Sequence, residues 1–403
     1  MTQLSLLEIP PTQKSMLELL MDEHVPYEAV EAMLETFLED ELAEFELLDV
    51  KADNETSISA KWKYSSGLQK SIRRGFVEDS VKCALTYHAI DPASFWKRLV
   101  IIAFEDVGVG DVWAVAMTLA VARSSVWRKR AGGDLIVIRY IVKRLAESVK
   151  DRTVADLCQV LENRSLSPSS LTLLKSNSPK GLSDMVLSDT VINTRIAAIW
   201  LLWGTDKMKN PRLPLRGGSR DWFDLTVENM RMPGLVKYIT LRGMVACRGC
   251  AMNICYSFVW ELLERSPYRQ VRETKVLPPF YISGVLEEAW DQHTREGKAA
   301  YLKFYQACTP VSNFLTTMRM VGNEEIIGAI GISLFISESA ILDRRIDFEG
   351  ADRVYRMTVE DDYQKKCLRL EDGVELSRLI LKHKPILREA RQNVVERSRL
   401  KRD

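Results

Sequence analysis

Apolar residues recur every three or four positions along most of this chain, which is the periodicity of one face of a helix. Helical patterns follow one another from Leu68 to about Ala146, although the β-branched run IVIRYIV at 136–142 also fits a strand. Further helices are expected at 188–206, where the helix ends at Gly204, and at 234–265, 279–305, 311–340 and 373–403. We find no internal repeat and no convincing hairpin, so the pattern predicts a mostly α, multi-helical fold.

Two segments interrupt the helical pattern. Residues 164–183, RSLSPSSLTLLKSNSPKGLS, are rich in Ser and Pro and predict a surface loop or a domain boundary. Residues 207–221, KMKNPRLPLRGGSRD, hold two prolines, two glycines and five bases and predict an exposed loop. With a linker at 51–57, these breaks predict an acidic arm at 1–60, a helical domain at 61–165 and a helical C-terminal region with a basic tail at 180–403.

The arm is expected to contain an amphipathic helix within residues 15–48, with Pro26 separating a short first helix from a longer second one. Its apolar face is formed by Ala29, Met33, Phe37 and Leu38. Its polar face is almost wholly acidic. Such a helix can dock on the chain's own basic surface or on a partner, or shield that surface by mimicking the charge of nucleic acid.

The near-neutral net charge of +1 hides a strong segregation. Residues 1–60 carry 15 acids and two bases, whereas the rest of the 403-residue chain carries 54 bases and 40 acids. A basic body with an acidic arm indicates an anionic partner, with nucleic acid as the first choice. The alternative is an acidic helix solvated on an ordinary surface.

Two compositional features bear on the compartment. The apolar runs at 99–104 and 196–203 are too short to span a bilayer, so no membrane partner is expected. Seven cysteines without regular spacing, and no pattern of a secretory signal, predict a reducing, cytoplasmic environment.

Clustered bases are the candidate nucleic-acid-binding residues, because cations neutralise phosphates and neighbouring aromatic rings stack on bases of single strands. The predicted set is Lys70, Arg73, Arg74, Arg128, Lys129, Arg130, Lys207, Lys209, Arg212, Arg216, Arg220 and Trp222. Further bases of these clusters are Arg123 and, at the C-terminus, Arg397, Arg399, Lys401 and Arg402. The segment LPLRGGSRDWF at 213–223 is the best single candidate, since its glycines let arginines approach a phosphate chain. The alternative is that these bases lie on solvated faces and that Trp222 belongs to the core.

The segment RLVIIAFEDVGVGD at 98–111 combines acids with glycines, as metal-binding and phosphate-binding loops do. We favour a structural interpretation, in which Gly108 ends one helix with a left-handed conformation and Asp111 caps the next. Glu105 and Asp106 then lie on a last helical turn, where the helix dipole disfavours acids, so a basic partner is expected. The candidates for that partner are Arg98, Arg73 and Arg74. No His or further acid lies at ligand spacing, so no metal is expected here.

Two other segments contain reactive side chains. Cys247-x2-Cys250-x4-Cys255 supplies half of a zinc motif, which Cys308, Cys367 or His293 would have to complete. Its apolar flanks favour buried structural thiols instead. The stretch 291–305 places His293 near Arg295 and Lys298, which fits phosphate binding or acid–base chemistry, but a helix junction at Gly297 is the favoured interpretation. No catalytic residue and no cofactor are predicted.

Residues 68–122 resemble the helical C-terminal region of RarA/MgsA-type AAA+ proteins, which are relatives of clamp loaders. Two stretches carry the resemblance: KSIR, beginning at Lys70 and followed by Ala84 and Leu85, and RLVIIAFEDVGVGD at 98–111. The resemblance implies a collar-like helical domain that supports oligomerisation on DNA. The chain has no G-x-x-x-x-G-K-[ST], and only about 67 residues precede the matching region, so we expect the ATPase half to be missing.

The resemblance and the charge segregation together predict a non-enzymatic accessory protein of replication, recombination or transcription. Such a protein binds single-stranded or gapped DNA and recruits a partner enzyme, and it can form a homo-oligomer. The alternative is a helical protein-interaction or assembly module, or an inhibitor of an AAA+ oligomer, without nucleic-acid binding. A third possibility is an enzyme that uses the His293–Lys298 region.

Overall fold

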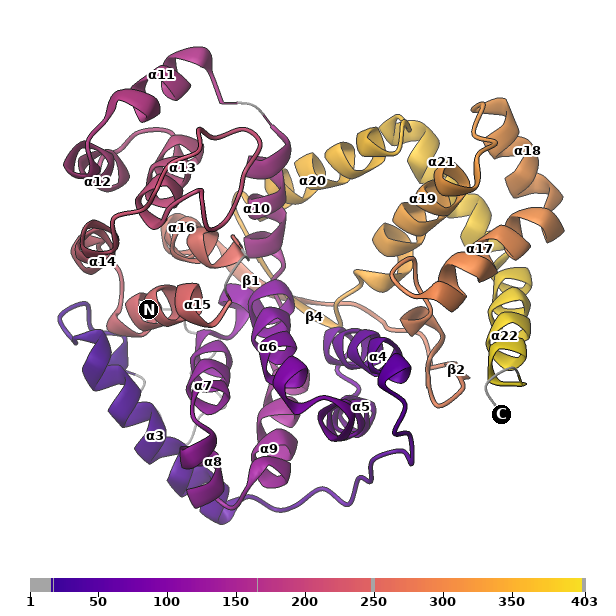
Figure 1. Ribbon diagram of the computed structural model, residues 1–403, viewed down its shortest axis with the longest axis horizontal. Helices are drawn as coiled ribbons and strands as arrows, with labels where there is room; N and C mark the ends of the chain where they lie inside the picture. Colours follow the sequence, from indigo (N-terminus) through magenta and orange to yellow (C-terminus); the bar gives the residue numbers. More distant parts are fainter. Residues whose placement is uncertain (1–15, 17, 165, 248–250, 401–403) are drawn as a thin grey trace. The chain divides into compact units, whose positions relative to one another are not determined.

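The computed structural model describes residues 16, 18–164, 166–247 and 251–400, and it is mostly helical, as the apolar periodicity predicts (Figure 1). Two compact units make up the fold, and each is built from three separate segments of the chain. Unit 1 contains residues 1–47, 96–272 and 344–355, and unit 2 contains residues 48–95, 273–343 and 356–403. Within the described residues, no helix has both the length and the apolar composition needed to traverse a bilayer.

This division differs from the predicted consecutive parts 1–60, 61–165 and 180–403. The reason lies in unit 2, where the early helix Lys61–Arg73 packs against a hairpin more than 200 residues later in the chain. A Cβ atom on Gly67 would lie 3.4 Å from the Val285 side chain, which shows how closely the two segments approach. Helical periodicity reports local structure only, so it does not reveal which distant segments share a core.

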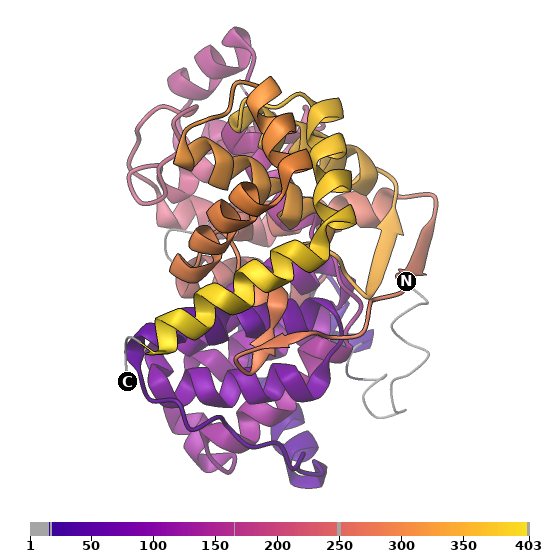
Figure 2. The same ribbon diagram turned by 90° about the vertical axis from the view of Figure 1, so that its right-hand side faces the viewer.

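The described part of unit 1 is a multi-helical body with one small sheet. The helices are α3 (Tyr27–Glu44), α6 (Pro92–Ile102, of which 96–102 belong here), α7 (Val112–Arg123), α8 (Ser125–Arg130), α9 (Asp134–Glu147), α10 (Thr153–Asn163), α11 (Pro168–Ser176), α12 (Pro179–Leu187), α13 (Ile192–Trp203), α14 (Arg220–Asn229), α15 (Gly234–Ala246) and α16 (Met252–Arg265). Strands β1 (Arg269–Glu273) and β4 (Arg344–Phe348) pair side by side (Figure 2). Helix α15 packs on α3, α7 and α16 and is buried along most of its length.

The described part of unit 2 joins two early helices to the C-terminal ones. The elements are α4 (Lys61–Arg73), α5 (Val77–Ile90), β2 (Tyr281–Ile282), β3 (Val285–Leu286), α17 (Arg295–Ala307), α18 (Thr309–Thr317), α19 (Asn323–Leu334), α20 (Ala351–Lys365, of which 356–365 belong here), α21 (Leu370–Lys382) and α22 (Lys384–Leu400). Helix α4 packs on α5, and α17 packs on α22 and α19. Helices α21 and α22 are the last two helices of the described chain, and α22 is drawn in yellow in Figure 2.

The prediction of a loop at 164–183 is wrong over most of that range, because helices α11 and α12 lie there. Each helix begins with a Ser-Pro pair. Ser167 accepts a hydrogen bond from the backbone N–H of Ser170 (3.1 Å), and Ser178 accepts one from Gly181 (3.2 Å). The following prolines occupy the first helical turn, where no backbone N–H is needed. The Ser and Pro residues that indicated a loop therefore start two helices.

The expected helix at 279–305 is also partly wrong. Tyr281 and Ile282 pair antiparallel with Leu286 and Val285, so a hairpin precedes α17. The two residues of its turn, Ser283 and Gly284, have φ values of 51° and 82°. This is the conformation that favours Gly and matches the twist of hairpin strands. In contrast, IVIRYIV at 136–142 lies within helix α9, which settles the alternative that the sequence left open.

The junction between α6 and α7 explains the acids and glycines of residues 103–111. Gly108 has a φ of 50°, and a Cβ atom there would lie 2.7 Å from the carbonyl oxygen of Asp151. The Gly108 carbonyl accepts a hydrogen bond from the Tyr256 hydroxyl (3.2 Å), and Asp111 caps α7 by accepting from the Ala114 N–H (3.0 Å). Close backbone approach and helix capping therefore account for this segment, as the structural interpretation predicts.

One basic partner of the two acids is Arg152, which the sequence did not single out. Its guanidinium donates to Asp106, whose side chain is fully buried, and lies 3.3 Å from Glu105. Arg152 precedes α10, and sequence spacing does not indicate this pairing because about 45 residues separate the partners.

Replacing Gly108 with Ala should lower the free energy of unfolding by about 2–4 kcal/mol, because a Cβ atom adds both left-handed strain and a clash with Asp151. Gly217→Ala is the matched control, since its Cβ atom would meet nothing within 4 Å. Urea unfolding followed by circular dichroism measures both. Equal stability of the two variants would show that the junction does not constrain the fold.

Candidate nucleic-acid interface

The predicted bases of α4 are buried inside unit 2 and do not form a surface cluster. Lys70 pairs with Asp291 and donates to the Ser66 hydroxyl (2.7 Å). Arg73 donates to the carbonyl of Ser339 (2.9 Å). Lys70, Arg73 and Arg74 are each less than a tenth exposed. These three bases are therefore withdrawn from the predicted interface, because their cationic groups stabilise buried acceptors.

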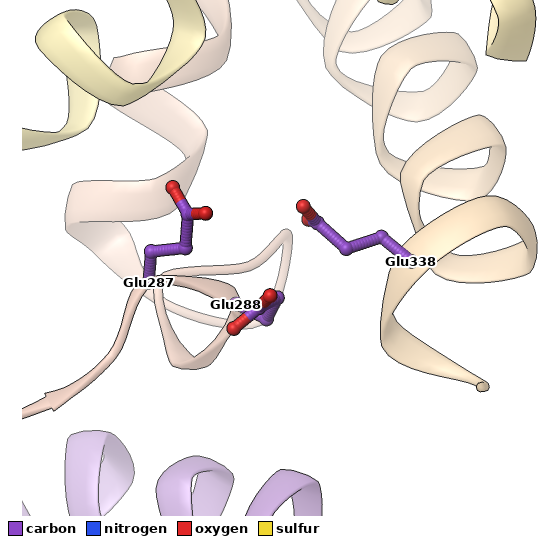
Figure 3. Close-up of side chains that lie close together, drawn as sticks. All are labelled: Glu287, Glu288 and Glu338. Atoms are coloured by element: carbon purple, nitrogen blue, oxygen red, sulfur yellow. The ribbon is translucent and has the colours of Figure 1, made fainter. Parts of the chain in front are cut away.

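Arg74 belongs to a buried cluster of charges that sequence reasoning missed. Glu287, Glu288 and Glu338 have carboxylate oxygens within 4.8 Å of one another, and no other described group of three His, Cys, Asp or Glu side chains is close enough to hold a metal ion. Glu287 and Glu288 lie on the short helical turn after β3, and Glu338 points toward them from the segment after α19 (Figure 3).

Four cations surround these three carboxylates. The closest contacts are Lys384 to Glu338 (2.6 Å), Arg388 to Glu287 (2.7 Å), Arg391 to Glu338 (3.3 Å) and Arg74 to Glu288 (3.5 Å). The positive charges outnumber the negative ones, so a divalent cation would meet net repulsion here. The cluster is an ion-pair network that joins α4, α22 and the segments carrying the acids, and we do not assign a metal to it.

Arg128 is likewise buried, within unit 1. Its Nε donates to Asp134 (2.8 Å), its Nη1 donates to the carbonyl of Val121 (2.7 Å), and its guanidinium lies over the ring of Trp96. It therefore connects α7, α8 and α9 and is also withdrawn from the interface. The neighbouring bases Lys129 and Arg130 are exposed, as predicted, but Trp127 is buried.

The acidic helix α3 docks on the basic face of unit 1, which is one of the alternatives that the sequence left open. Arg130 donates to Glu39 (2.6 Å), while Glu31 pairs with both Arg123 and Arg242, the latter at 2.8 Å. The buried apolar face consists of Val30, Leu34, Phe37, Leu38 and Leu42. Phe37 and Leu38 of the expected stripe are therefore confirmed, whereas Ala29 and Met33 are half-buried. Figure 1 shows α3, in indigo, running alongside α7.

The loop Gly204–Ser219 keeps the remaining predicted bases together on the surface of unit 1. Lys207, Lys209 and Arg212 are exposed, Arg220 follows at the start of α14, and Arg216 is half-buried. Lys207 and Arg220 both lie over the Trp203 ring, at 5.5 and 4.9 Å from its centroid. Trp222 is half-buried, so neither the exposed nor the core alternative describes it fully.

Internal hydrogen bonds hold this loop in one conformation. The buried Thr205 hydroxyl donates to the carbonyl of Pro214 (2.7 Å) and accepts from the backbone N–H of Arg216 (2.7 Å). Trp200 donates its indole N–H to the carbonyl of Met208 (2.8 Å). Gly204 ends α13 with a φ of 112°, as expected from its position after the apolar run. The loop is thus a preformed basic surface.

Two anchors within the loop limit the role of its bases. Arg216 donates to the carbonyl of Asn177 (2.8 Å), and Arg220 pairs with Asp224 (2.8 Å). Lys207, Lys209 and Arg212 are the exposed bases within the loop, so their substitution is used to test ligand binding. At the C-terminus, Arg397 and Arg399 are exposed on α22, while Lys401 and Arg402 lie outside the described residues.

The other candidate segments contain buried thiols and the start of a helix in their described parts. Cys247 and Cys255 are buried, as favoured, and Cys250 lies outside the described residues. Thr294 caps α17 by accepting from the Gly297 N–H (3.0 Å), so a helix begins in the predicted junction region. Comparisons of this chain with protein-family models, curated proteins and solved structures found no match.

The glutamate cluster predicts a loss of stability in acid. Burial raises the pKa of Glu338, but Arg391 and Lys384 outweigh it and hold the pKa below the ordinary value of 4.5. The ion pairs therefore stabilise the fold fully above pH 4.5, and this stabilisation is lost as the pH falls through the lower folded-state pKa. Glu338→Gln should lower the free energy of unfolding by about 3–5 kcal/mol at pH 7, because Arg391 and Lys384 lose their shared carboxylate in a buried environment.

Denaturant unfolding between pH 7 and pH 3 measures this effect. The wild-type chain should lose stability more steeply in acid than Glu338→Gln does. Glu375→Gln is the control, because Glu375 lies on the surface and pairs only with the exposed Arg378 in the described contacts. A Glu338→Gln variant as stable as this control would contradict the assigned role of the cluster.

Proposed function

We propose that this chain is a non-enzymatic accessory protein of DNA transactions that binds single-stranded or gapped DNA through the loop Gly204–Ser219. The observation that carries the proposal is the preformed basic loop, with two cations stacked on Trp203. Cations on a fixed loop attract a phosphate chain, and the half-buried ring of Trp222 beside the loop gives unpaired bases a stacking surface. Since the loop is already ordered by Thr205, binding does not require it to be ordered first.

Single strands suit this surface better than base-specific duplex recognition. The bases sit on an irregular loop rather than on a helix that could enter a major groove, and phosphate contacts carry no sequence information. The proposed binding is therefore sequence-independent and sensitive to salt. Recruitment of a replication, recombination or transcription enzyme, and oligomerisation, belong to the same proposal and are supported by the resemblance to RarA/MgsA-type proteins, which stays a prediction.

Changing Lys207, Lys209 and Arg212 together to Ala should weaken binding of a fluorescent 20-nucleotide oligothymidylate at least tenfold at low salt. Each lost phosphate contact on a single strand lowers the salt dependence of log K by about 0.7, so the slope should fall by about 2. Fluorescence anisotropy across a salt series measures both quantities.

The control removes three exposed cations of unit 2, Lys365, Arg378 and Lys382, and so changes the net charge equally. If the wild-type chain does not bind the oligonucleotide at low salt, the proposed function is wrong, and the helical interaction module becomes the better hypothesis. If both triple variants lose affinity equally, only net charge matters and the loop has no special role.

A further inference from the structure

Unit 2 contains a pocket of about 570 Å³ that shares no residue with the loop Gly204–Ser219. Its walls come from the linker at 53–55, the start of α4, the hairpin turn at 283–284, the start of α17 and the end of α22. Pockets that hold a small ligand usually measure roughly 300–1,000 Å³, so this one has room for a mononucleotide.

An exposed aromatic ring lies in the wall of this pocket. Trp62, the second residue of α4, is 62% exposed. Lys61 lies over the ring, 5.3 Å from its centroid, but its ammonium group is held by Asp91 (3.3 Å). Most of the Trp62 side chain is therefore accessible, and an accessible indole gives a nucleic-acid base a surface on which to stack.

Three cations of the pocket form no ion pair with a described acid. They are Lys63, Arg295 and Arg399, of which both arginines are exposed. Burial lowers the pKa of Lys63, nearby acids oppose this only in part, and the charge of Arg399 lowers the pKa further. An anion bound beside these cations would relieve their mutual repulsion.

The segment before α17, for which the sequence left phosphate binding open, lines the same pocket. His293 and Arg295 are exposed there, and Thr294 caps the helix by accepting from the Gly297 N–H (3.0 Å). The N-terminus of a helix carries a partial positive charge, which adds to the charge of these side chains. This part of the pocket is therefore suited to a phosphate group.

Three acids, Asp53, Glu55 and Glu296, line the pocket as well. Asp53 is fixed in place, because its backbone N–H donates to the Thr86 hydroxyl (2.9 Å) and its carboxylate accepts from the Tyr64 hydroxyl (2.9 Å). Carboxylates accept hydrogen bonds from hydroxyl and amino groups, which a nucleoside carries on its sugar and base. A phosphorylated tyrosine side chain has no such donors, so a wall with both charges favours a nucleotide.

We propose that this pocket binds a nucleoside monophosphate, with its base stacked on Trp62, its phosphate beside Arg295, Arg399 and the start of α17, and its sugar or base donors on the carboxylates. A free nucleotide and the phosphorylated terminal nucleotide of a strand share this chemistry. The inference goes beyond the proposed function and does not rest on it, because the pocket and the loop Gly204–Ser219 belong to different units.

Isothermal titration calorimetry of the full chain with AMP, adenosine and inorganic phosphate tests the two halves of the site separately. Trp62→Ala should weaken the binding of AMP and of adenosine about fivefold or more, because the stacking surface is lost, and should leave phosphate binding unchanged. Arg295→Ala should weaken the binding of AMP and of phosphate about fivefold or more, and should leave adenosine binding unchanged.

Two further variants serve as controls. Arg397→Ala removes an exposed cation of α22 that does not line the pocket, so AMP should bind this variant as it binds the wild type. Trp62→Phe keeps an aromatic ring and should restore most of the adenosine binding that Trp62→Ala loses. Because Trp62 and Arg295 are exposed, the unfolding temperature of their variants should not fall.

Two tetranucleotides of one sequence, with and without a 5′-phosphate, identify the source of the ligand. They are compared with AMP in the triple variant of Lys207, Lys209 and Arg212, so that these bases of the loop do not contribute. Tighter binding of the phosphorylated strand than of AMP supports the site as one for strand ends, and the reverse order supports it as one for a free nucleotide.

Three results would overturn the inference. The first is that AMP does not bind at about 10 mM. The second is that AMP binds equally to the wild type, Trp62→Ala and Arg295→Ala. The third is that O-phosphotyrosine binds through the same residues while AMP does not, since the pocket would then serve a modified protein. The proposed function fails separately, because the triple loop variant should bind AMP like the wild type whether or not the chain binds oligothymidylate.

Discussion

Pairing of arginine and lysine with carboxylates inside each unit determines which bases of this chain are left for a partner. In unit 2, Arg74, Lys384, Arg388 and Arg391 are held by three glutamates, and in unit 1 Arg152 is held by Glu105 and Asp106. Breaking such a pair leaves a buried charge without a partner, so these bases cannot be exchanged for phosphate contacts without loss of stability. The bases outside these networks, mainly on the loop Gly204–Ser219, carry the proposed binding.

Docking of α3 extends the same pairing to the surface. The charge segregation in the sequence indicates that the acidic arm and the basic body bind different partners. In the structure, however, glutamates of α3 pair with Arg123, Arg130 and Arg242 of the same unit. Its glutamates are therefore part of the folded surface and compete with external anions there. The affinity for nucleic acid therefore depends on the local charge of the surface, which is the charge of the exposed bases less that of the acids beside them. The net charge of the whole chain does not predict it.

Local signals in the sequence predicted local structure well. The α-helical class, the break at Pro26, the end of α13 at Gly204 and the cap at Asp111 follow from spacing and capping chemistry. The Ser-Pro pairs indicated a loop but start two helices, and the turn at Ser283–Gly284 was missed within an expected helix. The same residue types start helices, build turns and fill loops, and only the neighbouring backbone decides among these. The burial of Lys70 and Arg73 was not predictable from helical periodicity, since α4 is buried around most of its circumference.

The candidate site was predicted in part. The loop at 207–221 was singled out from its composition, and the structure keeps its bases together on one segment. The cluster of Glu287, Glu288 and Glu338 was not, because its acids and cations come from segments that are far apart in the sequence. Long-range assembly of this kind has no signature in a single sequence when no motif of fixed spacing is present.

Hydrogen–deuterium exchange of the full chain, with and without a saturating oligothymidylate, tests the central claim most directly. The account predicts slower exchange in the backbone of the loop Gly204–Ser219, together with unchanged exchange in α20 and α21. Unchanged exchange in that loop while the strand is bound, or protection confined to α20 and α21, would contradict it.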